Sequence, residues 1–497
     1  MAYIIEQKNK KNNRIYVYEV DAYWDPKKQQ SRQRRKYLGV KDPKTKEVEK
    51  KYNEGSRVRT ARDFGGVYFL RSISEKLKLT SCLKESFTNN WEEILDLAMF
   101  KIISGQSFYI FDDWSTSNYV RSNLSSQSIS DLLEDIDDKS FLDLWNKKHS
   151  SKDAAYFDIT SISSYSSGRN ACEYGYNRDK ERLKQINLGI ISSSISQLPL
   201  AYKSYPGSVS DVSTITNLIP LAKSWGIKSM LLILDCGFSS KENIEKLKAN
   251  KLDFITRLNP KNLNYDRLID MFCLSNENLF SFNGDAFFYQ QHEITIGKTS
   301  VFAHVFHSET KKNLELIKFL EKISEIEALV NDKTKEELQD IIKMQDLKDF
   351  FIFNKGVLKR NIDAIDKKIH CLGKFILLTN KKLYSSKFVL ESYRNKDLAE
   401  KLFDNLKTEI HISRLRTKKD STTNGSIFIS FLALILYSHL VKVLHNNKLT
   451  VQKILASLTT LKVIDLNNSK SILSEITKKN KDIFTLFDLE IPTTPRY

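Results

Sequence analysis

The sequence predicts a mixed α/β fold, in which a mixed sheet is flanked by helices, and three observations lead to this prediction. Residues 154–260 alternate between short apolar segments typical of strands and segments with helical periodicity. Residues 66–150 have helical periodicity alone, at 66–79, 91–104 and 130–147. The chain has 497 residues, of which 41% are hydrophobic, so it can form more than one folded core.

The order of the elements between 154 and 260 identifies the kind of sheet. Strands are predicted at 154–164, 186–195, 199–205, 229–235 and 253–257, with helices at 212–225 and 241–250. Three strands joined by short turns, followed by helical crossovers, predict a ribonuclease H-like mixed sheet in which the first and fourth strands are neighbours. Asp158 lies in the first strand and Asp235 ends the fourth. We therefore expect their carboxylates to face one another at one edge of the sheet, although 235 − 158 = 77 residues separate them.

The rest of the chain is divided by changes in composition and periodicity. The predicted parts are a small basic β-rich unit (1–65), a helical region expected to bind DNA (66–150), the first part of the ribonuclease H-like core (151–260), an α+β insertion (261–385), the second part of the core (386–445) and a helical C-terminal tail (446–497). The insertion would precede the last catalytic helix. The N-terminal region is basic and mostly helical.

The charge of the chain favours a polyanionic partner. There are 78 Lys and Arg residues against 61 Asp and Glu, which gives a net charge of +17 and a pI near 9.3. Lysine and arginine side chains that neutralise phosphates strengthen nucleic-acid binding, although a Lys-rich surface also keeps a large protein in solution. The basic run at 26–51 fits either a solvated loop or a segment that contacts DNA phosphates.

The remaining composition indicates a protein of a reducing compartment. Five cysteines form no C-x-x-C pair, and the N-terminus has no apolar signal segment. The apolar stretch 426–444 is interrupted by Ser, His and Lys, so we expect a buried core helix and no membrane association. The motifs of nucleotide and zinc sites are absent from the sequence. We expect a bacterial cytoplasmic protein associated with the nucleoid.

The segment 393–407 (YRNKDLAEKLFDNLK) contains the most informative local pattern. On one continuous helix, Tyr393, Lys396, Glu400 and Lys407 would lie on one face, because they are three, four and seven residues apart. A carboxylate would then lie between cations and a phenol. The spacing alone also fits an exposed helix with charge pairs between successive turns.

This segment resembles the Y-x2-R-x3-E-x6-K motif of a large group of bacterial insertion-sequence transposases. Tyr393, Glu400 and Lys407 match the motif, whereas Lys396 stands at the arginine position; the neighbouring Arg394 is an alternative source of a guanidinium group. Two further segments resemble the acidic motifs of the family in the same order. They are YFDITSIS, which contains Asp158, and LLILDCGFSSKENIEKLKANKLDFITRL, which contains Asp235. The resemblance covers roughly 155–260 and 370–445.

The resemblance implies a DNA transposase that cleaves insertion-sequence ends and transfers the strands into target DNA. Asp158, Asp235 and Glu400 would be the catalytic residues and would hold two Mg²⁺ ions, with Mn²⁺ as a substitute. Asp158 would bridge both ions. Mg²⁺ prefers carboxylate oxygens, and two ions suit in-line displacement at phosphorus.

The DNA contacts and partners follow from the same resemblance. Tyr393, Arg394, Lys396 and Lys407 would contact DNA. The partners would be the terminal inverted repeats of the element, target DNA and a second copy of the chain, as a homodimer on DNA.

Other interpretations remain open at this stage. The same fold could belong to a nuclease without strand transfer, or to a DNA-binding protein that descends from a transposase and has lost catalysis. Asp235 could serve only to cap a turn at the end of its strand, and Asp211 is expected to cap a helix. Asp112 and Asp113 are adjacent in sequence and are expected at the surface.

Overall fold

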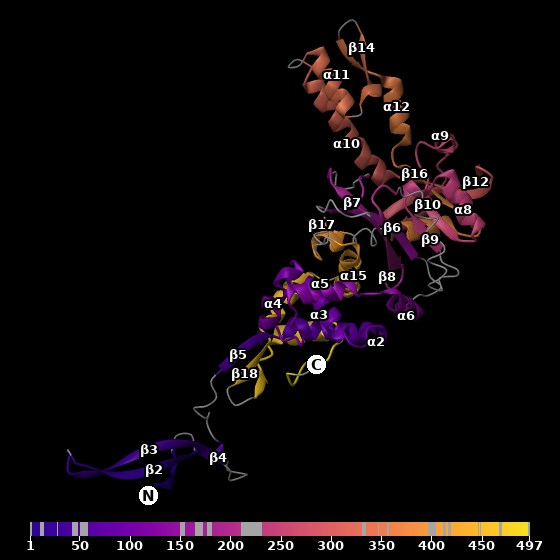
Figure 1. Ribbon diagram of the computed structural model, residues 1–497. Coiled ribbons are helices and arrows are strands. Elements are labelled where there is room, and N and C mark those ends of the chain that lie inside the picture. The colour runs from indigo at the N-terminus through magenta and orange to yellow at the C-terminus, as the bar shows by residue number, and fades with distance from the viewer. Residues whose placement is uncertain are drawn as a thin grey trace. The chain divides into compact units, whose positions relative to one another are not determined.

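In the computed structural model (Figure 1) the chain forms two compact units. The first contains Met1–Phe69, Ser115–Val120 and Gln452–Tyr497, and the second contains Leu70–Trp114 and Arg121–Val451. The structure describes residues 2–9, 14–26, 28–41, 48–49, 58–149, 155–164, 172–175, 181–209, 231–330, 334–345, 347–354, 357–395, 404–410, 414–415, 419–445, 447, 449–466 and 470–495. Each unit therefore combines segments that are far apart in the sequence.

The N-terminal sheet of the first unit is antiparallel. Its strands, in spatial order, are β1 (Ala2–Lys8), β2 (Ile15–Asp25), β3 (Gln30–Lys41) and β4 (Val48–Glu49). The strand predicted at 14–24 is confirmed, whereas the solvated loop considered for the basic run is wrong over β3. Acidic residues of β2 lie opposite basic residues of β3, with Glu19 opposite Lys36 and Asp21 opposite Arg34. Opposite charges on paired strands stabilise the pairing, which allows this basic segment to form a strand.

A second small sheet in the first unit joins the two ends of the chain. Its strands, in spatial order, are β19 (Ser471–Leu473), β18 (Lys462–Leu466) and β5 (Val58–Asp63). Helices α16 (Val451–Leu458) and α17 (Lys478–Leu486) belong to the same C-terminal segment. Phe69 and Phe487 pack edge to face, with ring centroids 4.9 Å apart. The segment expected to be a helical tail therefore also contributes two strands.

The helical region predicted at 66–150 is confirmed. Its helices are α1 (Gly65–Lys76), α2 (Leu79–Ser86), α3 (Trp91–Ser104), the short η1 (Phe108–Ile110), α4 (Phe111–Ser117), α5 (Ser126–Glu134) and α6 (Lys139–His149). The single helix predicted at 130–147 is wrong, because α5 ends at Glu134 and α6 begins at Lys139. Asp137 there accepts a hydrogen bond from the Lys139 backbone at 3.2 Å, which favours a new helix start. Asp112 and Asp113 are exposed, as predicted.

Helix α15 (Asp420–Leu444) is the apolar helix predicted at 426–444. It is long and apolar enough to span a membrane, and the bent pair 91–104 and 108–117 passes the same test of length and composition. Most residues of α15 are buried, and α15 packs against α3, α5 and the strand β8 of the sheet described next. This agrees with the predicted core helix.

The main sheet of the second unit has the predicted strand order. Its first five strands along the chain are β6 (Ala155–Ser164), β7 (Lys184–Ser193), β8 (Pro199–Pro206), β9 (Leu231–Leu234) and β10 (Asp253–Arg257). They lie in the order β10-β9-β6-β7-β8. Strand β6 is antiparallel to β7 and parallel to β9, and β9 is parallel to β10. The neighbouring first and fourth strands confirm the ribonuclease H-like arrangement, while the helix predicted at 212–225 and Asp211 lie outside the described residues.

The sheet continues beyond β10 into the region predicted as an insertion. Beyond β10 lie, in order, β16 (Lys374–Thr379), β13 (Thr299–Ser308), β12 (Asp285–Ile296) and β11 (Leu279–Phe282). Alternate residues of the strands supply two hydrophobic clusters. The α8 cluster includes Phe157 and Leu234 and is covered by α8 (Lys241–Ala249) and α9 (Leu263–Asp270). The α13 cluster includes Tyr156 and Ile233 and is covered by α13 (Ser386–Arg394).

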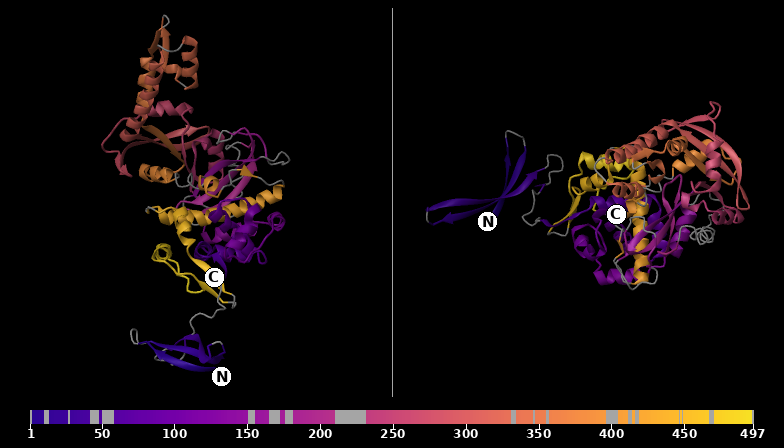
Figure 2. Two further views of the ribbon diagram at one scale, coloured as in Figure 1. Left: turned by 90° about the vertical axis from the view of Figure 1, so that its left-hand side faces the viewer. Right: turned by 90° about the horizontal axis from the view of Figure 1, so that it is seen from above.

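The helices of the predicted insertion form a small core of their own. They are α10 (Glu309–Ala328), α11 (Lys335–Met344), η3 (Lys348–Phe350) and α12 (Ile362–Cys371), with the hairpin β14 (Phe351–Asn354) and β15 (Val357–Arg360). Phe319, Ile323 and Ile342 belong to its hydrophobic cluster. These elements stay together in both views of Figure 2. The predicted block 261–385 thus contains strands of the main sheet as well as a separately packed helical part.

Candidate active site

Asp158 and Asp235 lie at the same level on neighbouring parallel strands. In the pairing of β6 with β9, Ala155 lies opposite Leu232 and Tyr156 lies opposite Ile233. The offset of 232 − 155 = 77 residues equals the separation of the two aspartates, so extending this register puts Asp158 beside Asp235. Neighbouring strands are about 4.8 Å apart. The backbone therefore has the arrangement that the sequence predicted, while the structure does not describe the Asp158 side chain.

The Asp235 carboxylate is held at the end of β9 by backbone contacts. Its Oδ1 accepts a hydrogen bond from the Cys236 backbone at 2.7 Å, so Asp235 caps the short helix η2 (Cys236–Phe238). The Asp235 carbonyl accepts a hydrogen bond from Thr256 Oγ1 at 2.9 Å. Thr256 is fully buried on β10. The turn-capping interpretation of Asp235 is therefore correct, and it is compatible with a second role because the cap fixes the carboxylate in a half-buried position.

Asp158 and Asp235 form a row across neighbouring strands, the aspartate row, and Arg257 lies one strand further along it. Leu234 lies opposite Thr256 in the parallel pairing of β9 with β10, and the next step of this register puts Arg257 beside Asp235. The Nε atom of Arg257 is buried and has no hydrogen-bond partner among the described residues. Burial raises the pKa of the neighbouring Cys236 thiol, and the charge of Arg257 opposes this shift. Arg257 was not among the site residues predicted from the sequence. Its place at the end of the predicted strand 253–257 was the one feature that could have indicated it.

Helix α13 lies over the same face of the sheet as Tyr156 and Ile233. Tyr393, in its last turn, packs against the α13 cluster. The Arg394 guanidinium lies over the rings of Phe287 and Phe375, 5.9 and 5.5 Å from their centroids. Both predicted DNA-binding residues therefore also contact the protein's own aromatic side chains.

The continuous helix predicted from 393 to 407 is wrong at its start. Helix α13 ends at Arg394, and Asn395 forms its C-cap. Asparagine favours helix ends because its side chain competes for backbone hydrogen bonds. Lys396 and Glu400 lie outside the described residues, and Lys407 is half-buried within the helical stretch 404–408. Whether Glu400 shares a face with Lys407 therefore stays a prediction.

Described elements before and after Glu400 contact the strands that carry the two aspartates. On the N-terminal side, α13 covers the face that Tyr156 and Ile233 share. On the C-terminal side, β17 (Arg414–Leu415) pairs with β6 in parallel, opposite Ser163 and Ser164. The segment between them thus starts and ends beside the strands that carry Asp158 and Asp235. The role of Glu400 stays a prediction.

Comparison with known proteins adds the family. Residues 149–436, more than half of the chain, match the family model of the transposase DDE domain. The chain belongs to this transposase family. The matched region contains β6 to β10, α13 and most of α15, and it includes all three predicted acidic residues.

Two further comparisons complete these findings. A solved structure, described as the cryo-EM structure of the piggyBac transposase synaptic complex with hairpin DNA, aligns with a TM-score of 0.34 and 11% sequence identity. The alignment covers 80% of this transposase and 70% of that chain. No curated protein matches the chain.

The donor set of this transposase suits a hard divalent cation. Asp235 and, by register, Asp158 would offer carboxylate oxygens from adjacent strands, which are the ligands that Mg²⁺ prefers. Within the described part of the chain, no three His, Cys, Asp or Glu side chains are grouped closely enough to hold an ion. This agrees with a site whose other two predicted carboxylates are not described.

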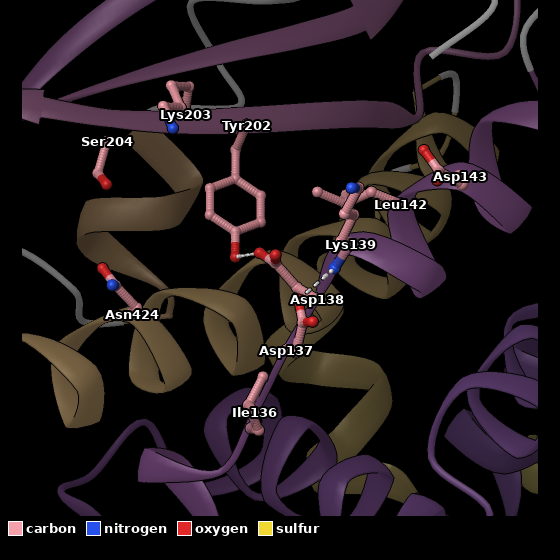
Figure 3. A pocket seen from close by; sticks show the side chains of 10 residues that line it. All are labelled: Ile136, Asp137, Asp138, Lys139, Leu142, Asp143, Tyr202, Lys203, Ser204 and Asn424. Atoms are coloured by element: carbon pink, nitrogen blue, oxygen red, sulfur yellow. Dashed lines mark hydrogen bonds between the residues drawn. The ribbon is translucent and has the colours of Figure 1, made fainter. Parts of the chain in front are cut away.

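A separate cavity of about 660 Å³ lies beside β8, the strand at one edge of the main sheet (Figure 3). Tyr202 and Asp138 point toward each other there, and the Tyr202 hydroxyl donates a hydrogen bond to Asp138. Burial raises the pKa of Asp138, and the hydrogen bond from Tyr202 opposes this shift. The cavity contains none of the predicted site residues. The cavity is therefore distinct from the predicted site.

Proposed function

We propose that this transposase-family chain cleaves DNA at the ends of an insertion sequence and transfers the freed strands into target DNA. The observation that carries the proposal is the register that puts Asp158 beside Asp235 on parallel strands, in a chain that matches the transposase DDE domain. Glu400 is proposed as the third catalytic residue. Two Mg²⁺ ions, or Mn²⁺ in their place, are the proposed cofactors of these carboxylates.

The proposed reaction has two steps of the same kind. In cleavage, water attacks a phosphorus atom at the element end, the bond from phosphorus to the 3′ oxygen breaks, and a 3′-hydroxyl is released. In strand transfer, this 3′-hydroxyl attacks a phosphorus atom of the target, and the target's own 3′-hydroxyl leaves. The chemistry that two bound Mg²⁺ ions supply is activation of the attacking oxygen and stabilisation of the leaving oxygen.

The chain's own residues would orient the reacting groups. The hydrogen bonds from the Cys236 backbone and the Thr256 hydroxyl fix Asp235, so that little reorganisation of its carboxylate is needed during the reaction. Tyr393, Arg394, Lys396 and Lys407 are proposed to contact DNA. A homodimer on DNA is proposed because transposition requires two element ends to be brought together.

The test is a cleavage and strand-transfer assay on duplex DNA from the flanks of the protein's own gene, with Mg²⁺ and with EDTA. We expect metal-dependent nicking at the element ends, followed by joined products. Asp158→Asn, Asp235→Asn and Glu400→Gln should each abolish both steps and leave DNA binding intact. The matched control is Glu242→Gln, which removes an exposed carboxylate from α8 and should cleave normally.

The other outcomes separate the competing functions. Nicking without joined products would replace the proposal with a nuclease of the same fold. Specific binding of the flanking DNA without nicking would indicate a transposase-derived binding protein that has lost catalysis.

A further inference from the structure

Three cations meet at the carboxyl edge of the sheet, next to Asp235. Arg257 ends β10, Lys311 lies in the first turn of α10, which follows β13, and Arg394 ends α13. Strand β13 is parallel to β10, since both are antiparallel to β16, so both strands end at this edge. Three elements that are remote in sequence therefore deliver one positive charge each to the same place.

The ring of Phe375 is the common neighbour of two of these cations. Lys311 Nζ lies 4.5 Å and Arg394 Cζ lies 5.5 Å from its centroid. Arg257 lies opposite Leu377 on β16, two residues along the strand from Phe375. Burial lowers the pKa of Lys311, the charge of Glu315 opposes this shift, and the positive charges of Arg257 and Arg394 add to it. The cations are thus close enough to repel one another.

Among the described residues, Lys311 is the one cation of the three with an ion-pair partner. Its partner is Glu315, at 3.6 Å, whose other oxygen accepts a hydrogen bond from the Gly373 backbone at 2.8 Å. Glu309, in the same turn of α10, is hydrogen-bonded to His307 at 2.8 Å and lies 3.6 Å from Lys312. The acids nearest to Arg257 along the sheet are Asp235 and Asp158, which are the proposed metal ligands. Arg257 and Arg394 are therefore the cations that an anion would complete.

Arg257 supplies a second, independent observation. Its Nε is buried and finds no hydrogen-bond partner within the described part of the chain. A buried charged donor without a partner is costly, so such an atom indicates a ligand or other partner that completes it. Lys311 is accessible to such a ligand, because its side chain retains 26% of its exposed area.

We propose that Arg257 and Lys311 bind a backbone phosphate of the DNA strand that lies across Asp235, with Arg394 as the third cation of this phosphate site. A guanidinium and an ammonium group close enough to interact suit a phosphate, and the register puts Arg257 one strand away from Asp235. The bound phosphate positions the strand for attack at the neighbouring aspartate row. Arg257 and Lys311 are positioning residues, and this inference rests on the proposed DNA substrate.

The experiment measures binding of the full-length chain to a duplex oligonucleotide from the flank of its gene, in EDTA and at several salt concentrations. Lys311→Gln should weaken binding about tenfold and lower the slope of log affinity against log salt by about one, the effect of one lost phosphate contact. Arg257→Gln should act in the same direction. Lys318→Gln is the matched control, because it removes an exposed lysine two turns further along α10 and should leave both values unchanged.

Duplexes with single neutral methylphosphonates identify the phosphate. At one phosphate position, the methylphosphonate should weaken binding by the wild-type chain as much as Lys311→Gln does. On that duplex the Lys311→Gln variant should show no further loss of affinity. Two results would overturn the proposal, provided that the far-ultraviolet circular dichroism of Lys311→Gln is unchanged. In the first, the variant binds DNA with the affinity and salt slope of the wild type. In the second, the loss of affinity caused by Lys311→Gln adds fully to the loss caused by each methylphosphonate, whichever phosphate is replaced.

The measurement separates this inference from the proposed function. Binding in EDTA does not require cleavage, so coupling between Lys311 and one phosphate would support the phosphate site even in a chain that nicks no DNA. Conversely, metal-dependent cleavage and joining without this coupling would support the transposase function and overturn the phosphate site.

Discussion

Charged side chains lie on adjacent strands in both units, but they are arranged in opposite ways. In the N-terminal sheet, acids of β2 lie opposite bases of β3, and Asp25 forms an ion pair with Arg32 at 3.5 Å. In the main sheet, the register puts Asp158 beside Asp235, so an acid neighbours an acid. Opposite charges at this separation attract and like charges repel. The first arrangement therefore stabilises its sheet, whereas in the second the repulsion between the two acids offsets the attraction of Asp235 to Arg257 on the next strand.

This difference separates charges with a structural role from charges with a chemical one. Two acids side by side at a strand end repel each other until a cation binds there. Local features that do not favour folding tend to be functional sites. The same kind of substitution should therefore lower stability in the N-terminal sheet and lower activity, with little effect on stability, in the main sheet.

The largest effect is expected for Asp235→Asn. Cleavage should fall by more than about a hundredfold. This exceeds the loss of about ten- to a hundredfold that is typical when a residue hydrogen-bonded to a metal ligand is changed. The amide retains an oxygen that can accept from the Cys236 backbone, so the cap of η2 is preserved. The free energy of unfolding in EDTA should change by less than about 0.8 kcal/mol, because the lost repulsion from Asp158 and the lost attraction to Arg257 offset each other. Each is about this large for two charges about 5 Å apart in water. Single-turnover cleavage and thermal unfolding measure the two effects.

The two measurements can fail separately. A variant that cleaves at the wild-type rate would remove Asp235 from the active site. A variant that loses activity but also loses stability would show that the carboxylate is needed for folding, and the contrast between the two sheets would no longer hold.

Acidification should destabilise the second unit more than the first. All eight histidines lie in the second unit. Burial lowers the pKa of His304 from 6.5 to about 4, so this side chain stays neutral in the folded chain while the unfolded chain binds a proton. Its contribution to stability is therefore present above pH 6.5 and is lost as the pH falls toward about 4. The loss is on the order of 3 kcal/mol.

Hydrogen–deuterium exchange at pH 7 and pH 5 can follow this loss in β13 and in the N-terminal sheet separately. After correction for the slower intrinsic exchange at pH 5, protection should fall in β13 and change little in the sheet β1–β4. His304→Gln should make the protection of β13 less dependent on pH. An equal loss of protection in both units, or an unchanged pH dependence in the variant, would assign the effect to other groups.

A smaller effect is expected for Thr256→Val, which removes a hydroxyl but keeps the shape of the side chain. The Asp235 carbonyl would lose its hydrogen bond from Thr256, which should cost about 1 kcal/mol of stability. Cleavage should fall about tenfold, with little change in DNA affinity, because Asp235 would be held less firmly. Thr256→Ser keeps the hydroxyl and should restore cleavage. A Thr256→Val variant that is less stable but cleaves normally would limit Thr256 to a structural role.

Much of the main sheet could be predicted from the sequence, because its strands carry strong local signals. The buried strand that ends at Leu234 is a continuous apolar run, and the strand 253–257 was predicted with its observed bounds. The break between α5 and α6 was missed, since apolar periodicity continues across the capping residue Asp137. Strand β3 was missed because its pairing depends on acids of β2 that precede it in the sequence.

The candidate site could be predicted only in part. Asp158 and Asp235 followed from the strand order, and their common level was confirmed by the register of β6 with β9. Arg257 and Lys311 were missed, because a single cation at the end of a strand or the start of a helix is too weak a signal to predict a site. Their convergence depends on the pairing of β10, β16 and β13, in which residues far apart in sequence become neighbours.

The smallest effect is expected for Asp25→Asn in the N-terminal sheet. Loss of the half-exposed ion pair with Arg32 should lower stability by less than about 1 kcal/mol. The loss should shrink at high salt, which screens exposed charges. Urea unfolding at two salt concentrations, followed by hydrogen exchange in β3, measures it. If Asp25→Asn instead left stability unchanged at low salt, the acids of the two sheets would not differ in their contribution to stability. The distinction between structural charges in the N-terminal sheet and chemical charges in the aspartate row would then lose its basis.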